Sequence, residues 1–251
     1  MQIQVLVATM NQSDHSLIEK MNIQSDALIG NQCNRDSVEH FVWNDYNISY
    51  YNFAERGVGL NRNNTLMRAS GDICLFADDD MIYVNGYPTI VENAFHDYPD
   101  ADVIIFNLIE QPPRRFVIST PTRINYLNYL RYGTARMAVK LSSIKNNGIY
   151  FNQCFGGGTE HSHGEDNIFL TSCLKHGLKI YAIPEYIATL TETRISTWNN
   201  GYSLKYLKDQ GFLYKAISKR WWKLLCLQDA LRHHKLYNRP WYEVFRIMIS
   251  L

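Results

Sequence analysis

A short apolar run that ends in three consecutive carboxylates constrains this chain more than any other feature. Residues 72–80 read Asp-Ile-Cys-Leu-Phe-Ala-Asp-Asp-Asp, and Gly71 precedes them. An apolar run bounded in this way predicts a buried strand of a parallel sheet. The carboxylates then lie at its carboxyl end, where open α/β sheets bind their ligands.

The three carboxylates Asp78, Asp79 and Asp80 repel one another, and removing them from water is costly. A hard divalent cation that prefers oxygen ligands, Mg²⁺ or Mn²⁺, would relieve that repulsion and would in turn favour a diphosphate. We therefore expect a metal-dependent nucleotide site at this edge of the sheet. The simpler alternative is a solvated acidic turn after the strand.

Strand and helix patterns alternate over the first 110 residues, and this alternation predicts the fold class. It favours an α/β fold with a mixed, mostly parallel sheet flanked by helices on both faces. The strand patterns cover 3–8, 27–30, 38–42, 49–53, 72–80 and 102–107, with helical patterns at 60–69 and 84–96. The later patterns predict a strand at 136–141, a glycine-rich turn at 155–158, a helix at 165–176 and a strand at 179–183 that Pro184 ends.

Two further segments carry candidate functional residues. Gly57-Val58-Gly59-Leu60-Asn61-Arg62 lies between a strand and a helix, and its glycine spacing excludes a dinucleotide-binding fingerprint. Arg62 could bind a phosphate or a base, or could be a surface residue after a tight turn. The second segment, 155–167, is glycine-rich and ends in Glu165-Asp166 at a predicted helix start. A carboxylate there either complements the helix dipole or serves as a general base.

Charge is unevenly distributed along the chain. Residues 211–251 contain eight Lys or Arg and two Asp or Glu, a net charge of +6, whereas the whole chain carries only +1. Basic and aromatic residues follow helical spacing over 212–236 and 241–251, which suits either an anionic membrane surface or a helical pair packed on the body. Because the rest of the chain is acidic, we do not expect a nucleic-acid partner.

Cysteine usage and the termini indicate the compartment. The five cysteines are scattered without a Cys-x-x-Cys pair, so the sequence indicates neither a zinc site nor a disulfide framework. The first residues lack the features of a signal peptide, and no stretch has the roughly 18 apolar residues needed to span a bilayer. We expect a cytoplasmic protein, in contact with the inner face of the plasma membrane if the basic arm binds lipid.

Taken together, the motifs resemble a family 2 glycosyltransferase of the GT-A fold. The order is an apolar strand with Thr9 and Asn11, then Gly-x-x-x-Asn-Arg-Asn with a helix, then Gly-Asp-Ile-x-Leu-Phe-Ala-Asp-Asp-Asp, and finally Gly-Glu-Asp. The resemblance covers residues 1–195. It implies a GT-A domain with a nucleotide-binding half at 1–110 and an acceptor half at 111–195, followed by a helical extension at 196–251.

The resemblance also implies an activity and site residues. Members transfer a sugar from a nucleotide-sugar donor, usually a UDP-sugar, with inversion, onto a glycan or lipid-linked acceptor such as those of bacterial surface polysaccharides. Asp166 of the Glu165-Asp166 pair matches the base. The remaining matches are Asp78 and Asp80 on Mg²⁺ or Mn²⁺, Asp79 near the ribose or donor sugar, and Thr9, Asn11 and Arg62 near the nucleoside.

Two departures from the family pattern bear on the site. Where many relatives have an aspartate that binds uracil, this chain has Asn31-Gln32, whose amides can pair with a base edge. Where some relatives have a metal-binding histidine after the last strand, residues 191–198 contain none. Glu192 or a water would have to substitute, and His161 and His163 belong to another segment.

Two other functions compete with sugar transfer. A sugar nucleotidyltransferase also joins a metal to nucleotide phosphates, but it would need a basic, glycine-rich signature near the N-terminus, where residues 7–11 read Val-Ala-Thr-Met-Asn. A non-catalytic carbohydrate- or partner-binding scaffold would tolerate the loss of Asp166 and the acidic triplet. The intact motifs favour an enzyme.

Overall fold

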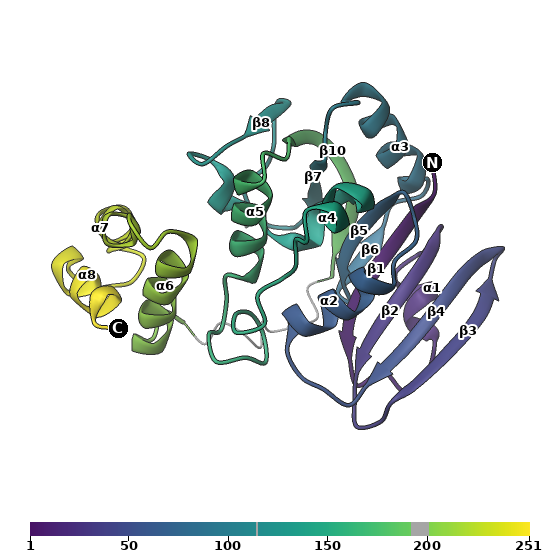
Figure 1. Cartoon of the computed structure of the whole chain (residues 1–251), viewed down its shortest axis with the longest axis horizontal. Helices are drawn as coiled ribbons and strands as arrows, with labels where there is room; N and C mark the ends of the chain where they lie inside the picture. Colours follow the sequence, from purple (N-terminus) through teal and green to yellow (C-terminus); the bar gives the residue numbers. More distant parts are fainter. Residues whose placement is uncertain (114, 192–200) are drawn as a thin grey trace.

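The computed structural model describes residues 1–113, 115–191 and 201–251. In this part of the chain a ten-stranded sheet has the order β3-β4-β2-β1-β5-β9-β7-β10-β6, with β8 paired to β10 (Figure 1). The strands are β1 (Ile3–Met10), β2 (Asp26–Gln32), β3 (Ser37–Trp43), β4 (Tyr46–Phe53), β5 (Ile73–Asp78), β6 (Met81–Tyr83), β7 (Val103–Ile109), β8 (Thr122–Ile124), β9 (Met137–Lys140) and β10 (Ile180–Leu190).

Most described strands run in one direction. β4, β2, β1 and β5 pair in parallel, and so do β7 and β10. β3, β6, β8 and β9 pair antiparallel with their neighbours. The mixed, mostly parallel sheet confirms the predicted fold class. Its consequence for function is that the segments following β1, β2, β4, β5 and β7 meet at one edge.

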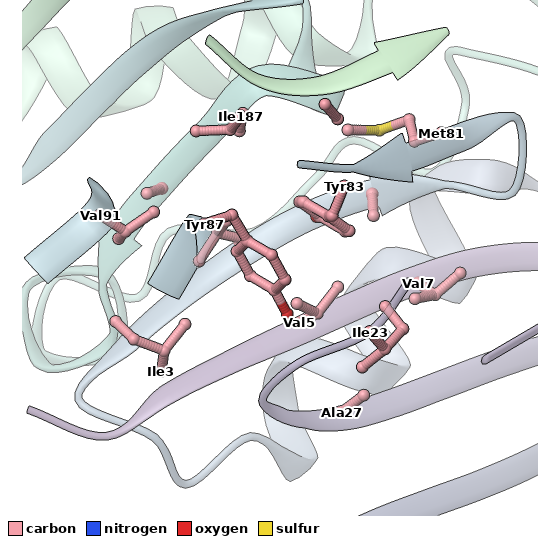
Figure 2. Packing of buried hydrophobic residues seen from close by; sticks show 14 of the residues in the cluster. Ile3, Val5, Val7, Ile23, Ala27, Met81, Tyr83, Tyr87, Val91 and Ile187 are labelled. Carbon is pink, nitrogen blue, oxygen red and sulfur yellow. The ribbon is translucent and has the colours of Figure 1, made fainter. Parts of the chain in front are cut away.

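Each face of the sheet is covered by helices because the side chains of its strands alternate in direction. On one face, Val5 and Val7 of β1 join a cluster with α1 (Ser16–Lys20) and α3 (Tyr87–Asp97) (Figure 2). On the other face, Leu6 joins a second cluster. That cluster includes residues of α2 (Val58–Arg68), α4 (Leu141–Asn146) and α5 (Glu165–Lys175).

The C-terminal residues form a separate helical unit beyond α5, at the yellow end of Figure 1. It consists of α6 (Leu204–Ile217), α7 (Trp222–His233) and α8 (Trp241–Ile249), which bury a third apolar cluster. Phe155 of the body belongs to this cluster, and α6 packs against α5. These three helices lie within the segment 196–251 that is expected to be a helical extension, and the expected boundary at residue 195 lies outside the described residues.

Two predicted element boundaries are wrong. Pro184 does not end the last strand, because β10 continues to Leu190. The proline lies where the pairing with β7 shifts register between Ala182 and Tyr186, a position at which no ladder hydrogen bond is required. The single helix predicted for 212–236 is two helices, since Ser218 is extended and its Oγ accepts a hydrogen bond from the Trp221 amide.

The helices of the described residues include none that is both long enough and apolar enough to cross a membrane.

Candidate active site

A cleft with a volume of about 1060 Å³ opens at the carboxyl ends of the parallel strands. Residues from both 1–110 and 111–195 line it, including the ends of β1 and β5, the turn before α2 and the start of α5. Of the ten residues predicted for the site, the eight other than Asn31 and Glu165 line the cleft, and they are Thr9, Asn11, Gln32, Arg62, Asp78, Asp79, Asp80 and Asp166. Glu165 lines the cleft as well, so the fold brings together motifs that are far apart in the sequence.

The three aspartates after β5 have different environments. Asp78 Oδ1 accepts a hydrogen bond of 2.7 Å from Arg62 Nη2. Asp79 Oδ2 accepts one from the Thr9 hydroxyl and a longer one from Gln12 Nε2. Asp80 is fixed through its backbone, because its carbonyl accepts hydrogen bonds from the amide and hydroxyl of Thr191. The triplet is thus an ordered part of the cleft and not a freely solvated turn.

Burial, and then the neighbouring charges of Asp78 and Asp79, raise the pKa of Asp80 above its ordinary value. A carboxylate whose ionised form is disfavoured in this way would be stabilised by a nearby cation. Within residues 1–113, 115–191 and 201–251, there is no group of three or more His, Cys, Asp or Glu side chains that could together hold a metal ion. Mg²⁺ generally needs only one or two carboxylates beside waters and substrate phosphates, so Asp78 and Asp80 could hold it together with a diphosphate.

Arg62 connects the acidic triplet to the Glu-Asp pair. Its Nη2 binds Asp78, and its Nη1 binds Glu165 Oε1 at 2.8 Å. Burial opposes the charge of this guanidinium, but Asp78 and Glu165 outweigh it and raise the Arg62 pKa. The guanidinium also lies over the ring of Phe151, 5.5 Å from its centroid. Arg62 therefore lines the predicted nucleotide site while it bridges two carboxylates from separate elements.

Asp166 lies in the first turn of α5 and combines burial with a like-charged neighbour. Burial and then the charge of Glu165 raise the pKa of Asp166 to about 7, although Arg62 acts in the opposite direction. Its Oδ1 accepts a hydrogen bond from the Asn167 amide, and its Oδ2 faces Gly133, where an added methyl group would lie 3.2 Å away. A carboxylate with a pKa near neutrality can exchange a proton with a bound hydroxyl group.

The residues predicted near the nucleoside do not all reach the cleft. Asn11 does so with a left-handed backbone, φ 56°, which asparagine tolerates. Gln32 also lines it, with its Nε2 donating to the Gly57 carbonyl. Asn31 is fully buried and is not brought to the cleft surface. Its amide bonds to Gln12 and Asn52 instead, so it supports the loop after β1.

Other lining residues were not predicted from the sequence. Arg56 precedes the turn into α2, and Arg115 follows β7 and pairs with Glu110. Both add positive charge to a cleft that is otherwise rich in carboxylates. One sequence feature could have indicated these two arginines: each follows a strand of the parallel part of the sheet. Both lie in segments with irregular sequence patterns, where we predicted no site residue.

The two histidines near the Glu-Asp pair have structural partners. His161 Nδ1 lies 3.2 Å from Asp209 Oδ1, and His163 Nε2 lies 2.8 Å from Gln210 Oε1. His163 also lines the cleft. Glu192, the predicted substitute for a metal-binding histidine, lies outside the described residues.

Comparison of the whole structure with known proteins identifies its fold. No family model matches the sequence. No curated protein matches the sequence either. Among solved structures, the 1–349 fragment of S. aureus TarS in complex with UDP-GlcNAc is similar with a TM-score of 0.65 at 14% identity, over 100% of this chain and 91% of that one.

A mannosyltransferase from Pyrobaculum calidifontis, PcManGT, in complex with GDP-Man and Mn²⁺, is also similar. The TM-score is 0.55 at 12% identity, over 98% of this chain and 73% of that one. These likenesses concern the arrangement of the chain, since so few residues are identical. Together with the mixed sheet and its flanking helices, they show that the protein has the GT-A fold.

Proposed function

We propose that the protein is an inverting glycosyltransferase. It transfers a sugar from a nucleotide-diphosphate donor, a UDP-sugar, to a hydroxyl group of a glycan or lipid-linked acceptor. The observation that carries this proposal is the single cleft in which Arg62 joins the acidic triplet to the Glu165-Asp166 pair. One side of that cleft suits a metal-bound diphosphate, and the other provides a carboxylate with a raised pKa.

Support for the donor comes from the chemistry of the cleft and from the similar structures. TarS is described with UDP-GlcNAc and with UDP, and PcManGT with GDP-Man and Mn²⁺. In this chain Asp78 and Asp80 would hold Mn²⁺ or Mg²⁺. When bound, the cation would neutralise negative charge on the diphosphate leaving group.

The residues of the chain divide the remaining work between them. Asp166 takes the proton of the acceptor hydroxyl as its oxygen attacks the anomeric carbon. Arg62 holds Asp78 and Glu165 in fixed positions, so the donor and acceptor sides keep their spacing. Arg56 and Arg115 add positive charge near the leaving group. A one-step displacement needs a base and no second carboxylate as a nucleophile, unlike the retaining hydrolases.

Thermal stability in the presence of nucleotide sugars tests the donor assignment. A ligand that binds only the folded state raises the melting temperature, by mass action. We expect a UDP-sugar with Mn²⁺ to raise it more than either component alone, because the cation and the diphosphate share the acidic triplet. No increase with UDP-, GDP- or other nucleotide sugars, with or without Mn²⁺ or Mg²⁺, would contradict the proposal.

We also propose that the C-terminal unit contacts an anionic membrane surface. Trp221, Leu224 and Leu231 are 54%, 57% and 51% exposed, and their spacing places them on one side of α7. Lys223 and Arg232 are exposed beside them. Such a stripe can insert apolar side chains between lipid headgroups while its cations bind phosphates.

Vesicle co-sedimentation tests this contact. The protein should bind vesicles that contain phosphatidylglycerol more strongly than vesicles of phosphatidylcholine alone, and added salt should weaken the binding. Leu224→Ser should reduce the bound fraction, whereas Val42→Ser, at an apolar position of β3 that is even more exposed, should not. Equal binding to both kinds of vesicle, or to none, would reject a membrane role for α7.

A further inference from the structure

We propose that Asp209 of α6 is a positioning residue for the transfer reaction. The C-terminal helical unit then contributes to the geometry of the active site. This inference rests on the proposed function. It concerns the segment 154–164, called here the base loop because it leads directly into Glu165 and Asp166. Gly157, Gly158 and the residues 162–164 of this loop line the cleft.

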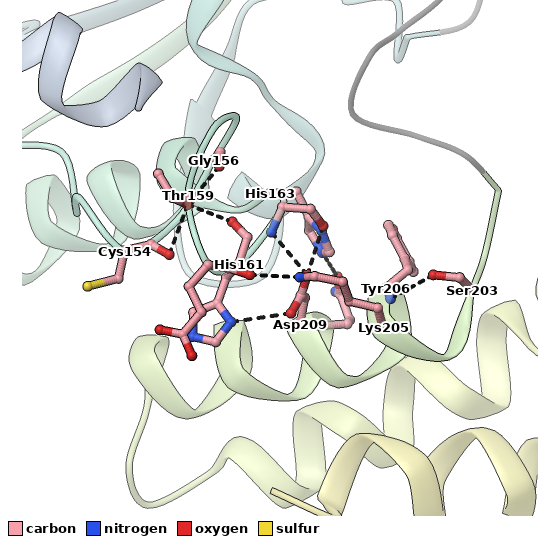
Figure 3. A network of polar contacts seen from close by, with 12 residues as sticks. Cys154, Gly156, Thr159, His161, His163, Ser203, Lys205, Tyr206 and Asp209 are labelled. Atoms are coloured by element: carbon pink, nitrogen blue, oxygen red, sulfur yellow. Dashed lines mark hydrogen bonds and ion pairs between the residues drawn. The ribbon is translucent and has the colours of Figure 1, made fainter. Parts of the chain in front are cut away.

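Asp209, a residue that is only 3% exposed, binds the base loop through its carboxylate. Its Oδ2 accepts hydrogen bonds from the Ser162 amide at 3.0 Å and from the Ser162 hydroxyl at 2.9 Å. Its Oδ1 lies 3.2 Å from His161 Nδ1, which must carry the proton because the carboxylate can only accept. Figure 3 shows these contacts converging on one side chain.

Lys205 closes the same network from one turn earlier in α6. Its Nζ lies 2.7 Å from Asp209 Oδ2 and donates to the Glu160 carbonyl of the base loop at 2.7 Å (Figure 3). Burial alone would raise the pKa of Asp209, but the hydrogen bonds from Lys205, Ser162 and His161 lower it below its ordinary value. The carboxylate is therefore charged at neutral pH, which strengthens each of its hydrogen bonds.

Ring contacts fix the two loop histidines on the same face of α6. His161 lies between Phe155 and Phe212, with 4.5 Å between ring centroids on each side. His163 stacks on Tyr206 at 4.4 Å. Its Nε2 also contacts Gln210, one residue beyond Asp209. Polar and aromatic contacts thus hold the loop at both histidines.

At Gly164, the residue immediately before Glu165, the base loop lies directly against α6. Its φ of +105° is a conformation that side chains rarely adopt, and an added methyl group would lie 2.7 Å from Leu213 of α6. The contact surface of α6 therefore extends from Glu160 to the start of α5. Because α5 carries Asp166 in its first turn, the anchoring of the base loop to α6 fixes the position of this candidate base.

The contacts assigned to the donor come from other elements. Thr9, Asp78 and Asp80 belong to β1 and the segment ending β5, and α6 contributes no residue to the cleft lining among the described residues. Loss of the Asp209 anchor should therefore slow transfer more than it weakens donor binding. A displacement of a reacting group by about 1 Å can lower a rate by as much as ~100-fold.

Asp209→Asn is the test, with Asp229→Asn as its matched control. Asp229 is 5% exposed, lies in α7 of the same unit and binds His233 and Tyr237, both of which belong to that unit. In Asp209→Asn we expect kcat for nucleotide-sugar turnover to fall about tenfold or more. The Kd for UDP with Mn²⁺ should stay within about twofold, and amide exchange of the base loop should accelerate about tenfold. Asp229→Asn should change neither kcat nor base-loop exchange.

Unchanged kcat and unchanged loop exchange in Asp209→Asn would overturn the proposal, and so would an equal fall of kcat in both variants. If Asp209→Asn fails to fold, Lys205→Met replaces it, because this side chain is 62% exposed. It should accelerate exchange of the base loop, whereas Lys208→Met, at another exposed position of α6, should not. Loop exchange needs no substrate, so a wild-type protein without donor turnover would reject the proposed function separately from the anchor.

Discussion

Replacement of Asp166 by asparagine should lower the rate of sugar transfer by about 10²- to 10⁴-fold, while the protein keeps its affinity for donor and metal. Asparagine fills the same space beside Gly133 and can still accept the hydrogen bond from the Asn167 amide. It cannot take up a proton from the acceptor hydroxyl. Steady-state turnover and calorimetric titration with UDP and Mn²⁺ separate the two effects.

The pH dependence of the wild-type protein provides a second check on this base. Because burial and Glu165 raise the pKa of Asp166 to about 7, the carboxylate is largely protonated below that pH and cannot act as a base. We therefore expect kcat/KM to rise with pH through an apparent pKa near 7, and we expect this rise to disappear in Asp166→Asn.

A matched control for the substitution is Asp45→Asn. Asp45 is exposed in the turn between β3 and β4, with a φ of 69° that asparagine also adopts readily. This variant should have wild-type turnover and a wild-type pH profile. If Asp166→Asn turned over donor at the wild-type rate, the assignment of the base would be wrong.

Replacement of Asp80 by alanine should abolish the metal-dependent part of donor binding. The raised pKa of Asp80 means that its ionised form is disfavoured in the folded protein, first by burial and then by Asp78 and Asp79. The folded state therefore holds its proton more tightly than the unfolded state, so stability falls as the pH rises through the interval above the ordinary aspartate pKa.

Removal of this carboxylate should therefore have opposite effects with and without ligand. The metal-free variant should melt at a higher temperature than the metal-free wild type at neutral pH. UDP and Mn²⁺ together should raise the melting temperature of the wild type, and this rise should be lost in the variant. The control is Asp97→Ala, since Asp97 is exposed near the end of α3 and far from the triplet in the sequence. A titration in which Asp80→Ala binds UDP and Mn²⁺ as the wild type does would reject the metal role.

Much of the sheet could be predicted from the sequence because its parallel strands are short apolar runs followed by polar loops. The run ending at Asp78 illustrates this, since it is buried throughout and carries the triplet to the cleft. Arg62 and Asp166, which follow from similar local patterns, also line the cleft. Their direct link through Glu165 could not be predicted, because Arg62 and Glu165 are 103 residues apart and no local pattern specifies that pairing.

The errors arose where tertiary structure overrides a local signal. Pro184 normally ends a strand, but an irregularity in the β7–β10 pairing accommodates it. Asn31 has a side chain suited to a base edge, yet its amide is engaged by Gln12 and Asn52 beneath the cleft surface. The network around Asp209 was not predicted either, because it joins two segments that share no sequence signal.

Analysis of the products formed from a UDP-sugar in the presence of Mn²⁺ tests the central claim most directly. With a hydroxyl acceptor, or slowly with water in its place, the wild-type protein should release UDP and transfer the sugar. EDTA should stop the release, and Asp166→Asn should reduce it to near the uncatalysed rate. Formation of a nucleotide sugar and pyrophosphate from a nucleoside triphosphate and a sugar phosphate would contradict the account, as would UDP release that is unaffected by EDTA and by Asp166→Asn.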